Sequence, residues 1–179
     1  IIFIMAFFAK NNKLKYSLFF LTPFIHIGFV IMIFLSMIST YIDNINLRIN
    51  SKIFIVFILV ILFSFALNNF TSETIKQLKG GEQDIFSSGI GFIFWFFYFS
   101  ILGVFLDTKK LHNSNKNFYL LSIAMLMFYL SNYFFFYGSA RILQAGLFFL
   151  ILSLMYLNKI GRFLGVNLFL VFIVYDWSH

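Results

Sequence analysis

Cysteine is absent from this 179-residue sequence, and charged residues make up only 11% of it. Without cysteine the chain forms no disulfide, holds no metal through a thiolate and has no cysteine nucleophile. The shortage of charge excludes an ordinary soluble domain, in which about a quarter of the residues are charged. The class of the protein is therefore indicated by the residues that stand in place of the charged ones.

Apolar residues take their place. Hydrophobic residues form 61% of the chain and aromatic residues 23%, and the mean hydropathy is +0.95. This composition indicates an integral membrane protein. The net charge of +7 comes from lysines and arginines that fall mostly in short breaks between apolar runs. Positive charge at such places sets the orientation of a membrane protein, so we do not expect a nucleic-acid partner.

Seven apolar segments follow one another, each bounded by a charged or Asn/Gly-rich break. Residues that are apolar on every face over such lengths are typical of helices in lipid. We therefore predict an all-α, polytopic integral membrane helical bundle that forms a single transmembrane domain over residues 1–179. The segments are Ile1–Ala9, Ser17–Thr40, Ile53–Phe70, Ile85–Leu106, Phe118–Gly138, Ile142–Leu157 and Phe163–Trp177.

The first segment, Ile1–Ala9, is shorter than the roughly 20 apolar residues that cross a bilayer, and the chain begins with isoleucine. We expect the chain to be a fragment that lacks N-terminal helices.

The lysines and arginines predict the topology. If every segment crosses once, six cations face one side and seven the other. The segment Ser17–Thr40 is interrupted by Pro23 and Gly28, and we predict that it is broken or re-entrant; a break in Ile53–Phe70 is a variant. Ten cations then share the cytoplasmic side, in agreement with the positive-inside rule. Three remain outside, namely Lys76, Lys79 and Arg141.

His26 is an ionisable side chain inside an apolar segment. A charged group at membrane depth costs about 2 to 3 kcal/mol on insertion scales, so His26 is a candidate for a site that faces a polar interior. The alternative is a core histidine bonded to a carbonyl of a neighbouring helix. No histidine or carboxylate lies at ligand spacing from His26, so we expect no metal site there.

Arg141 lies between two apolar segments with no other charge nearby. Near the start of the helix Ile142–Leu157, its guanidinium and the free backbone N–H groups of the helix suit a phosphate or carboxylate, and a diphosphate above all. The alternative is an arginine that reaches from the helix to the membrane surface.

The loop between the third and fourth segments, Thr71–Asp84, holds both carboxylates and lysines. It is long enough for a short amphipathic helix that ends at Gly80. Its carboxylates can accept a proton from a sugar hydroxyl, and its lysines can bind phosphate; an ordinary solvated loop is the alternative. The candidate binding residues are Lys76, Lys79, Glu82 and Asp84.

Three of these features together resemble the EpsG/Wzy-like family of bacterial surface polysaccharide (O-antigen, capsule, exopolysaccharide) polymerases, in its C-terminal part. They are the lysine-rich stretch Lys10–Tyr16, the segment Phe24–Gly28 with its central histidine, and Ser139–Gly146 with its arginine. The chain has Gly28 where family members often have serine or threonine, and Gly146-Leu147 where they often have Tyr-Phe.

The resemblance implies an activity. A growing glycan is transferred from undecaprenyl diphosphate to a hydroxyl of a lipid-linked repeat unit, at the outer face of the bacterial cytoplasmic (inner) membrane. It implies that His26 is the base or orients substrate and that Arg141 binds the diphosphate, assisted by Lys76 or Lys79. Glu82 and Asp84 are alternative bases. The resemblance calls for no cofactor. The partners that it implies are membrane lipid and the flippase and chain-length regulator of the same pathway.

Other functions remain open at this stage. A transporter or flippase of lipid-linked oligosaccharide uses a similar bundle and typically shows inverted repeats. A membrane acyltransferase that modifies surface sugars also needs an intramembrane histidine, with a further polar partner at helical spacing, and His26 has only Thr22 there. A scaffold subunit has no site at all.

Overall fold

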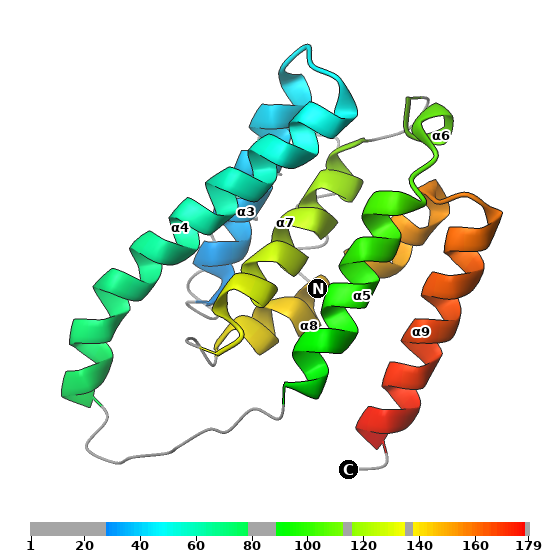
Figure 1. The fold of residues 1–179 in the computed structure, drawn as a ribbon. Helices are drawn as coiled ribbons and strands as arrows, with labels where there is room; N and C mark the ends of the chain where they lie inside the picture. The colour runs from blue at the N-terminus through cyan, green and yellow to red at the C-terminus, as the bar shows by residue number, and fades with distance from the viewer. Residues whose placement is uncertain (1–27, 79–88, 113–115, 135–137, 178–179) are drawn as a thin grey trace.

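The computed structural model describes residues 28–78, 89–112, 116–134 and 138–177, and within these ranges the chain is all-helical (Figure 1). The prediction of an all-α chain is confirmed for this part of the sequence. The elements are α3 (Gly28–Asn44), α4 (Ile49–Leu78), α5 (Ile90–Val104), α6 (Thr108–His112), α7 (Lys116–Asn132), α8 (Gly138–Ser153), the 3₁₀ turn η1 (Leu154–Tyr156) and α9 (Lys159–Trp177).

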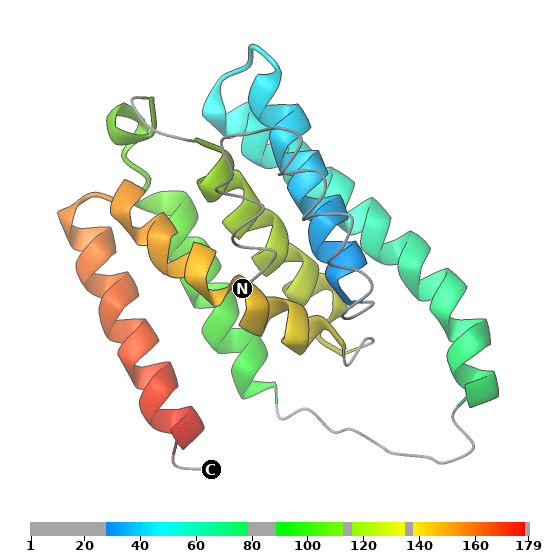
Figure 2. The same ribbon diagram turned by 180° about the vertical axis from the view of Figure 1, so that it is seen from behind.

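The long helices lie side by side, and α7 occupies the middle of the bundle (Figure 1). It packs against α3, α4, α5 and α8. Seen from behind, α8 runs obliquely across the bundle (Figure 2). The outer edges are formed by α4 on one side and α9 on the other, and α9 is held by α5 and η1.

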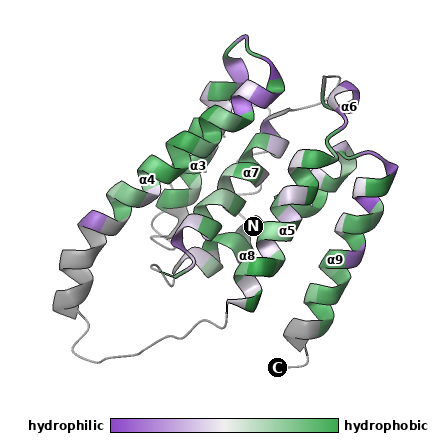
Figure 3. Cartoon of the chain, in the orientation of Figure 1, coloured by the Kyte–Doolittle hydropathy of each residue, from purple (hydrophilic) through white to green (hydrophobic). Residues whose placement is uncertain are grey.

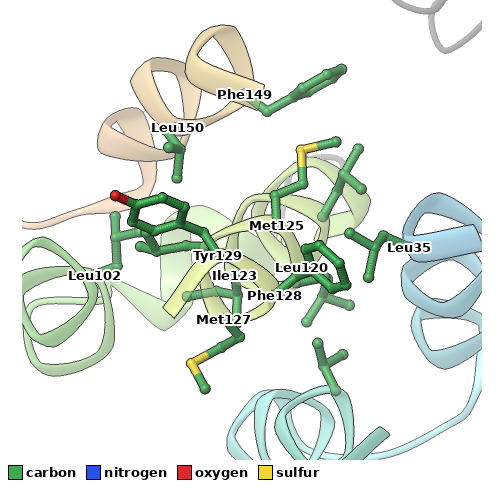
Figure 4. Close-up of a cluster of buried hydrophobic side chains, with 14 of the residues drawn as sticks. Leu35, Leu102, Leu120, Ile123, Met125, Met127, Phe128, Tyr129, Phe149 and Leu150 are labelled. Atoms are coloured by element: carbon green, nitrogen blue, oxygen red, sulfur yellow. The ribbon is translucent and has the colours of Figure 1, made fainter. Parts of the chain in front are cut away.

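The core is built around α7, whose residues are buried without interruption from Tyr119 to Leu130. A helix at the surface of a globular protein is apolar along one stripe only, whereas α7 is covered on every face. Its side chains extend toward the surrounding helices, where they meet Leu35 of α3, Leu102 of α5 and Phe149 of α8 (Figure 4).

Hydroxyl groups inside this core bond to backbone carbonyls of neighbouring helices. The Tyr119 hydroxyl donates to the Leu102 carbonyl at 2.7 Å, and the Ser122 hydroxyl reaches the Phe149 carbonyl at 2.7 Å. Tyr98 of α5 donates to the Leu150 carbonyl at 3.0 Å. These bonds join α5, α7 and α8. Because each of these hydroxyls has a partner, none of them carries the free-energy cost of an unpaired polar group in the core.

The α4 helix corrects two predictions. It is one unbroken helix of 30 residues, so the variant topology with a break in Ile53–Phe70 is wrong. The residues Thr71–Leu78 are helical but continue α4 instead of forming a separate helix. The reason is that α4 contains no glycine or proline that would interrupt it.

Two further boundaries differ from the prediction. Gly138 begins α8, whereas the sequence predicted it as the end of the preceding segment. The short helix α6 was not predicted. It forms because Asp107 caps it: Oδ1 accepts the backbone N–H groups of Lys109 at 3.2 Å and Lys110 at 3.4 Å.

The two ends of the bundle differ in charge. We call the end that carries the α3–α4 turn, α6 and the start of α9 the cationic end, and the end where α7 stops and α8 begins the opposite end. Hydrophilic residues gather at the cationic end (Figure 3). Among the described residues the opposite end has two cations, Lys76 and Arg141. The cationic end has seven, Arg48, Lys52, Lys109, Lys110, Lys116, Lys159 and Arg162.

By length and composition, one described stretch is long and apolar enough to cross a membrane, Ile49–Leu67 in α4. Only 22% of its window is buried inside the protein. Shorter apolar stretches of 10–17 residues lie in α3, α5, α7 and α8 with η1.

Candidate functional site

The sequence-predicted site lies mostly outside the described residues. His26, Lys79, Glu82 and Asp84 fall outside them, and so does the predicted break at Pro23, so these predictions remain untested. Lys76 lies in the last turn of α4 and Arg141 in the first turn of α8. The side chains of both are also outside the description, but their helices place both positions at the opposite end of the bundle.

At the same end, α4 and α7 share a buried polar network of Ser64, Ser131 and Asn132. The Asn132 amide nitrogen donates to the Ser64 hydroxyl oxygen and to the Phe128 carbonyl, each at 2.8 Å. The hydroxyls of Ser64 and Ser131 lie 2.8 Å apart, and Ser131 is 3.1 Å from the Phe128 carbonyl. Three polar side chains thus meet between α4 and α7.

The hydrogens of this network are all used. Because a carbonyl only accepts, the Phe128 oxygen fixes the side of the Asn132 amide that carries nitrogen. The amide hydrogens go to Ser64 and Phe128, the Ser64 hydroxyl donates to Ser131, and Ser131 donates to Phe128. The Asn132 Oδ1 atom is the one group in the network that is buried and has no partner.

An unpaired buried carbonyl oxygen costs about 1 to 3 kcal/mol. This oxygen only accepts hydrogen bonds, and it lies inside the protein, since Asn132 is 0% exposed. Arg141, by contrast, carries a guanidinium, which only donates. They lie at the same end of the bundle, the first in the last turn of α7 and the second in the first turn of α8.

Aromatic side chains pack beside this network. The ring of Tyr133, which follows Asn132, meets Phe92 of α5 with centroids 5.7 Å apart and Tyr129 with centroids 5.3 Å apart, both edge to face. Gly91 lets the tyrosine approach α5, since a Cβ there would lie 2.8 Å from the Tyr133 hydroxyl. These contacts fix the backbone just after Asn132.

Sequence reasoning missed Asn132 and Ser64, although the signal was present. Each is a polar residue inside a predicted apolar segment, Phe118–Gly138 or Ile53–Phe70, which is the same argument that singled out His26. What the sequence does not contain is the register between α4 and α7 that brings the two side chains together.

Among the described residues no group of three His, Cys, Asp or Glu side chains is placed to hold a metal ion. Comparison of the chain with family models, with curated proteins and with solved structures gives no match. The resemblance to polysaccharide polymerases therefore remains a prediction from the motifs quoted above.

Proposed function

We propose that this chain is a multi-pass protein of the bacterial cytoplasmic membrane that polymerises lipid-linked oligosaccharide repeat units into a surface polysaccharide. The observation that carries the proposal is the separation of charge between the two ends of the bundle, seven described cations against two. By the positive-inside rule the cationic end faces the cytoplasm and the opposite end faces outward. The outward end is the one that holds Arg141 and Asn132.

The surface of the outer helices supports the membrane placement. Phe65 of α4, Val104 of α5 and Phe163 of α9 are 67%, 75% and 69% exposed. Six serines are buried instead, among them Ser39, Ser122 and Ser153. Large exposed apolar patches are rare on soluble monomers, whereas lipid is their natural surrounding.

The short helices fit this placement. With 17 residues, α3 and α7 are about 25 Å long at 1.5 Å per residue, somewhat less than a bilayer core of about 30 Å. Because α7 is enclosed by other helices, its length does not have to match the lipid. The longer α4 and α9, with 30 and 19 residues, form the outer edges of the bundle.

The proposed reaction is a glycosyl transfer. A sugar hydroxyl of the incoming repeat unit attacks the anomeric carbon of the growing glycan, the bond from that carbon to the diphosphate oxygen breaks, and the hydroxyl proton passes to a base. In this proposal His26 is the base, with Glu82 and Asp84 as alternatives, and undecaprenyl diphosphate leaves. Arg141, with Lys76 or Lys79, stabilises the charge on the leaving group.

The Asn132 network has a structural role that the motifs did not predict. It joins α4 to α7 inside the protein, where Asn132 is fully buried, and so supports the end of the bundle that holds Arg141 without contacting substrate.

The test is the surface-glycan ladder of strains whose chromosomal gene is deleted or carries Arg141→Ala. Arg48→Ala, at the cationic end, is the matched control, and an immunoblot confirms that each protein is present. We expect the deletion and Arg141→Ala to leave a core with a single repeat unit, and Arg48→Ala to keep the ladder. Arg141→Lys should restore part of the ladder, because it keeps the charge but not the forked donors.

Three outcomes contradict parts of the proposal. A normal ladder in the deletion strain rules out polymerisation by this protein. A core without any repeat unit indicates transport of the lipid-linked unit. A normal ladder with Arg141→Ala alone leaves the function in place and removes Arg141 from the site.

A further inference from the structure

Two cations from distant parts of the chain converge on one backbone oxygen at the cationic end. The Lys110 ammonium donates to the Leu157 carbonyl at 2.7 Å, and an Arg162 guanidinium nitrogen lies 3.5 Å from the same oxygen. Lys110 precedes Leu157 by 47 residues. Like charges this close repel one another, so something other than their own interaction keeps them together.

A backbone clasp holds them. Leu106 and Leu157 form an antiparallel bridge. Beside it, the Asp107 N–H donates to the Tyr156 carbonyl at 2.9 Å and the Asn158 N–H to the Phe105 carbonyl at 3.0 Å. The two cations therefore project from a fixed frame and not from two independent loops.

The charge of this cluster is not balanced by the described residues. Lys109 and Lys159 are exposed beside Lys110 and Arg162. Against these four cations the clasp provides one carboxylate, Asp107, whose Oδ2 lies 3.5 Å from the Lys110 ammonium. The Leu157 carbonyl accepts hydrogen bonds from the two cations but has no negative charge to neutralise them. The cluster keeps an excess of positive charge with exposed donors, which attracts an anion such as phosphate.

Exposed apolar side chains flank the same cluster. Ile160 and Phe163, on either side of Arg162 in sequence, are 63% and 69% exposed. Val104, at the end of α5, is 75% exposed. A free phosphate ion would use only the cations, whereas a phospholipid would use both the cations and the apolar surface.

We propose that the clasp between α5 and α9 binds the phosphate of an anionic phospholipid of the inner leaflet, with Lys110 and Arg162 as its ligands and Lys109 and Lys159 at its rim. This site rests on the membrane placement proposed above and not on the polymerisation reaction. It fixes the cytoplasmic end of α9 against α5 by adding an anion between cations that otherwise repel.

The test uses the purified full chain in neutral detergent, titrated with phosphatidylglycerol while its melting temperature and its bound lipid, by native mass spectrometry, are recorded. We expect phosphatidylglycerol to raise the melting temperature and phosphatidylcholine to have little effect. The variant Lys110→Gln/Arg162→Gln should need about tenfold more phosphatidylglycerol for the same shift. The charge-matched control Arg48→Gln/Lys116→Gln should respond as the wild type does.

If the double variant does not fold by circular dichroism, the single variants Arg162→Gln and Lys159→Gln replace it, each with an expected weakening of about threefold. Equal responses of the site and control variants overturn the proposal. So does an equal shift with inorganic phosphate, which indicates a free-anion site. The glycan ladder tests polymerisation separately, so each proposal can fail while the other stands.

Discussion

Asn132, in the last turn of α7, donates an amide hydrogen to the hydroxyl oxygen of Ser64 in α4 over 2.8 Å, across 68 residues of sequence. The bond fixes α4 against α7 at the end of the bundle where Arg141 lies in the first turn of α8. It also turns the amide so that its oxygen is left without a partner. One side chain thus joins two helices and leaves one acceptor buried without a partner.

Removing the Asn132 amide should destabilise the bundle. Asn132→Leu leaves the Ser64 hydroxyl and the Phe128 carbonyl with fewer partners, and we expect a loss of about 1 kcal/mol, since polar contacts between membrane helices average ~0.6 and reach ~1.7. Unfolding in mixed micelles measures it. The control Ser100→Ala removes a bond within one helix, to the Phe96 carbonyl, and should change little. If Ser64→Ala and Asn132→Leu add without coupling, the two side chains do not act together.

Replacing Gly161 with a larger residue should destabilise the folded protein. A Cβ there would lie 2.2 Å from the Phe105 Cβ, an atom close to the backbone that cannot rotate away. We expect Gly161→Ala to cost about 1 to 3 kcal/mol of unfolding free energy. Gly103→Ala is the control, because a Cβ at Gly103 meets nothing within 4 Å. It should stabilise α5 by up to about 1 kcal/mol. Equal melting temperatures of the two variants would contradict the close approach of α9 to α5.

The ion pair between Asp43 and Lys52 should respond unequally to loss of either partner. The Lys52 ammonium donates to the Asp43 carbonyl at 2.5 Å and lies 3.5 Å from its carboxylate, with the side chains 4% and 22% exposed. Asp43→Ala leaves a buried cation without its counter-charge, whereas Lys52→Met leaves a carboxylate that still reaches solvent. We expect Asp43→Ala to be the more destabilising, and adding Lys52→Met to it to restore stability. The reverse order in thermal unfolding would refute this assignment.

Asp107 should make stability depend on acid pH. Burial by itself raises the pKa of this carboxyl, but hydrogen bonds from the backbone and side chain of Lys110, the backbone of Lys109 and the charge of Lys110 outweigh it and hold the pKa below its ordinary value of 3.8. The carboxylate therefore stabilises the folded state above that value, and the contribution is lost as the pH falls through the lowered pKa.

We expect the melting temperature of the wild type to fall more between about pH 5 and pH 3 than that of Asp107→Asn, which keeps the capping oxygen but does not titrate. The other carboxylates are common to both proteins and cancel in the comparison. Parallel pH profiles would show that the Asp107 charge does not contribute.

The helices could be predicted because each signal is local. Uninterrupted apolar residues between charged breaks identified six of the described helices, although α4 continues to Leu78, beyond its predicted end at Phe70, and α7 ends at Asn132, before its predicted end at Gly138. The misassignments have local causes as well. Gly138 lies in a break between two apolar segments and so does not stand out as a helix start, and the five residues of α6 depend on the Asp107 cap.

For the candidate site, the sequence identifies residue types but not which residues are neighbours in the fold. His26 and Arg141 stand out because a charge among apolar residues is visible in one dimension. The network of Ser64 with Asn132, and the convergence of Lys110 with Arg162, depend on how helices far apart in sequence align. The sequence around a serine or a loop lysine does not indicate which distant residue it contacts, so these contacts are seen only in the structure.

The complete enclosure of α7 has a consequence for biosynthesis. The helix is synthesised after α3, α4 and α5 and before α8. In the folded protein its residues Tyr119 to Leu130 are buried on every face of the helix. Until α8 is made, the side of α7 that will meet Phe149 and Leu150 stays uncovered. A nascent chain that ends just after α7 should therefore expose apolar surface that a chaperone or a protease can recognise.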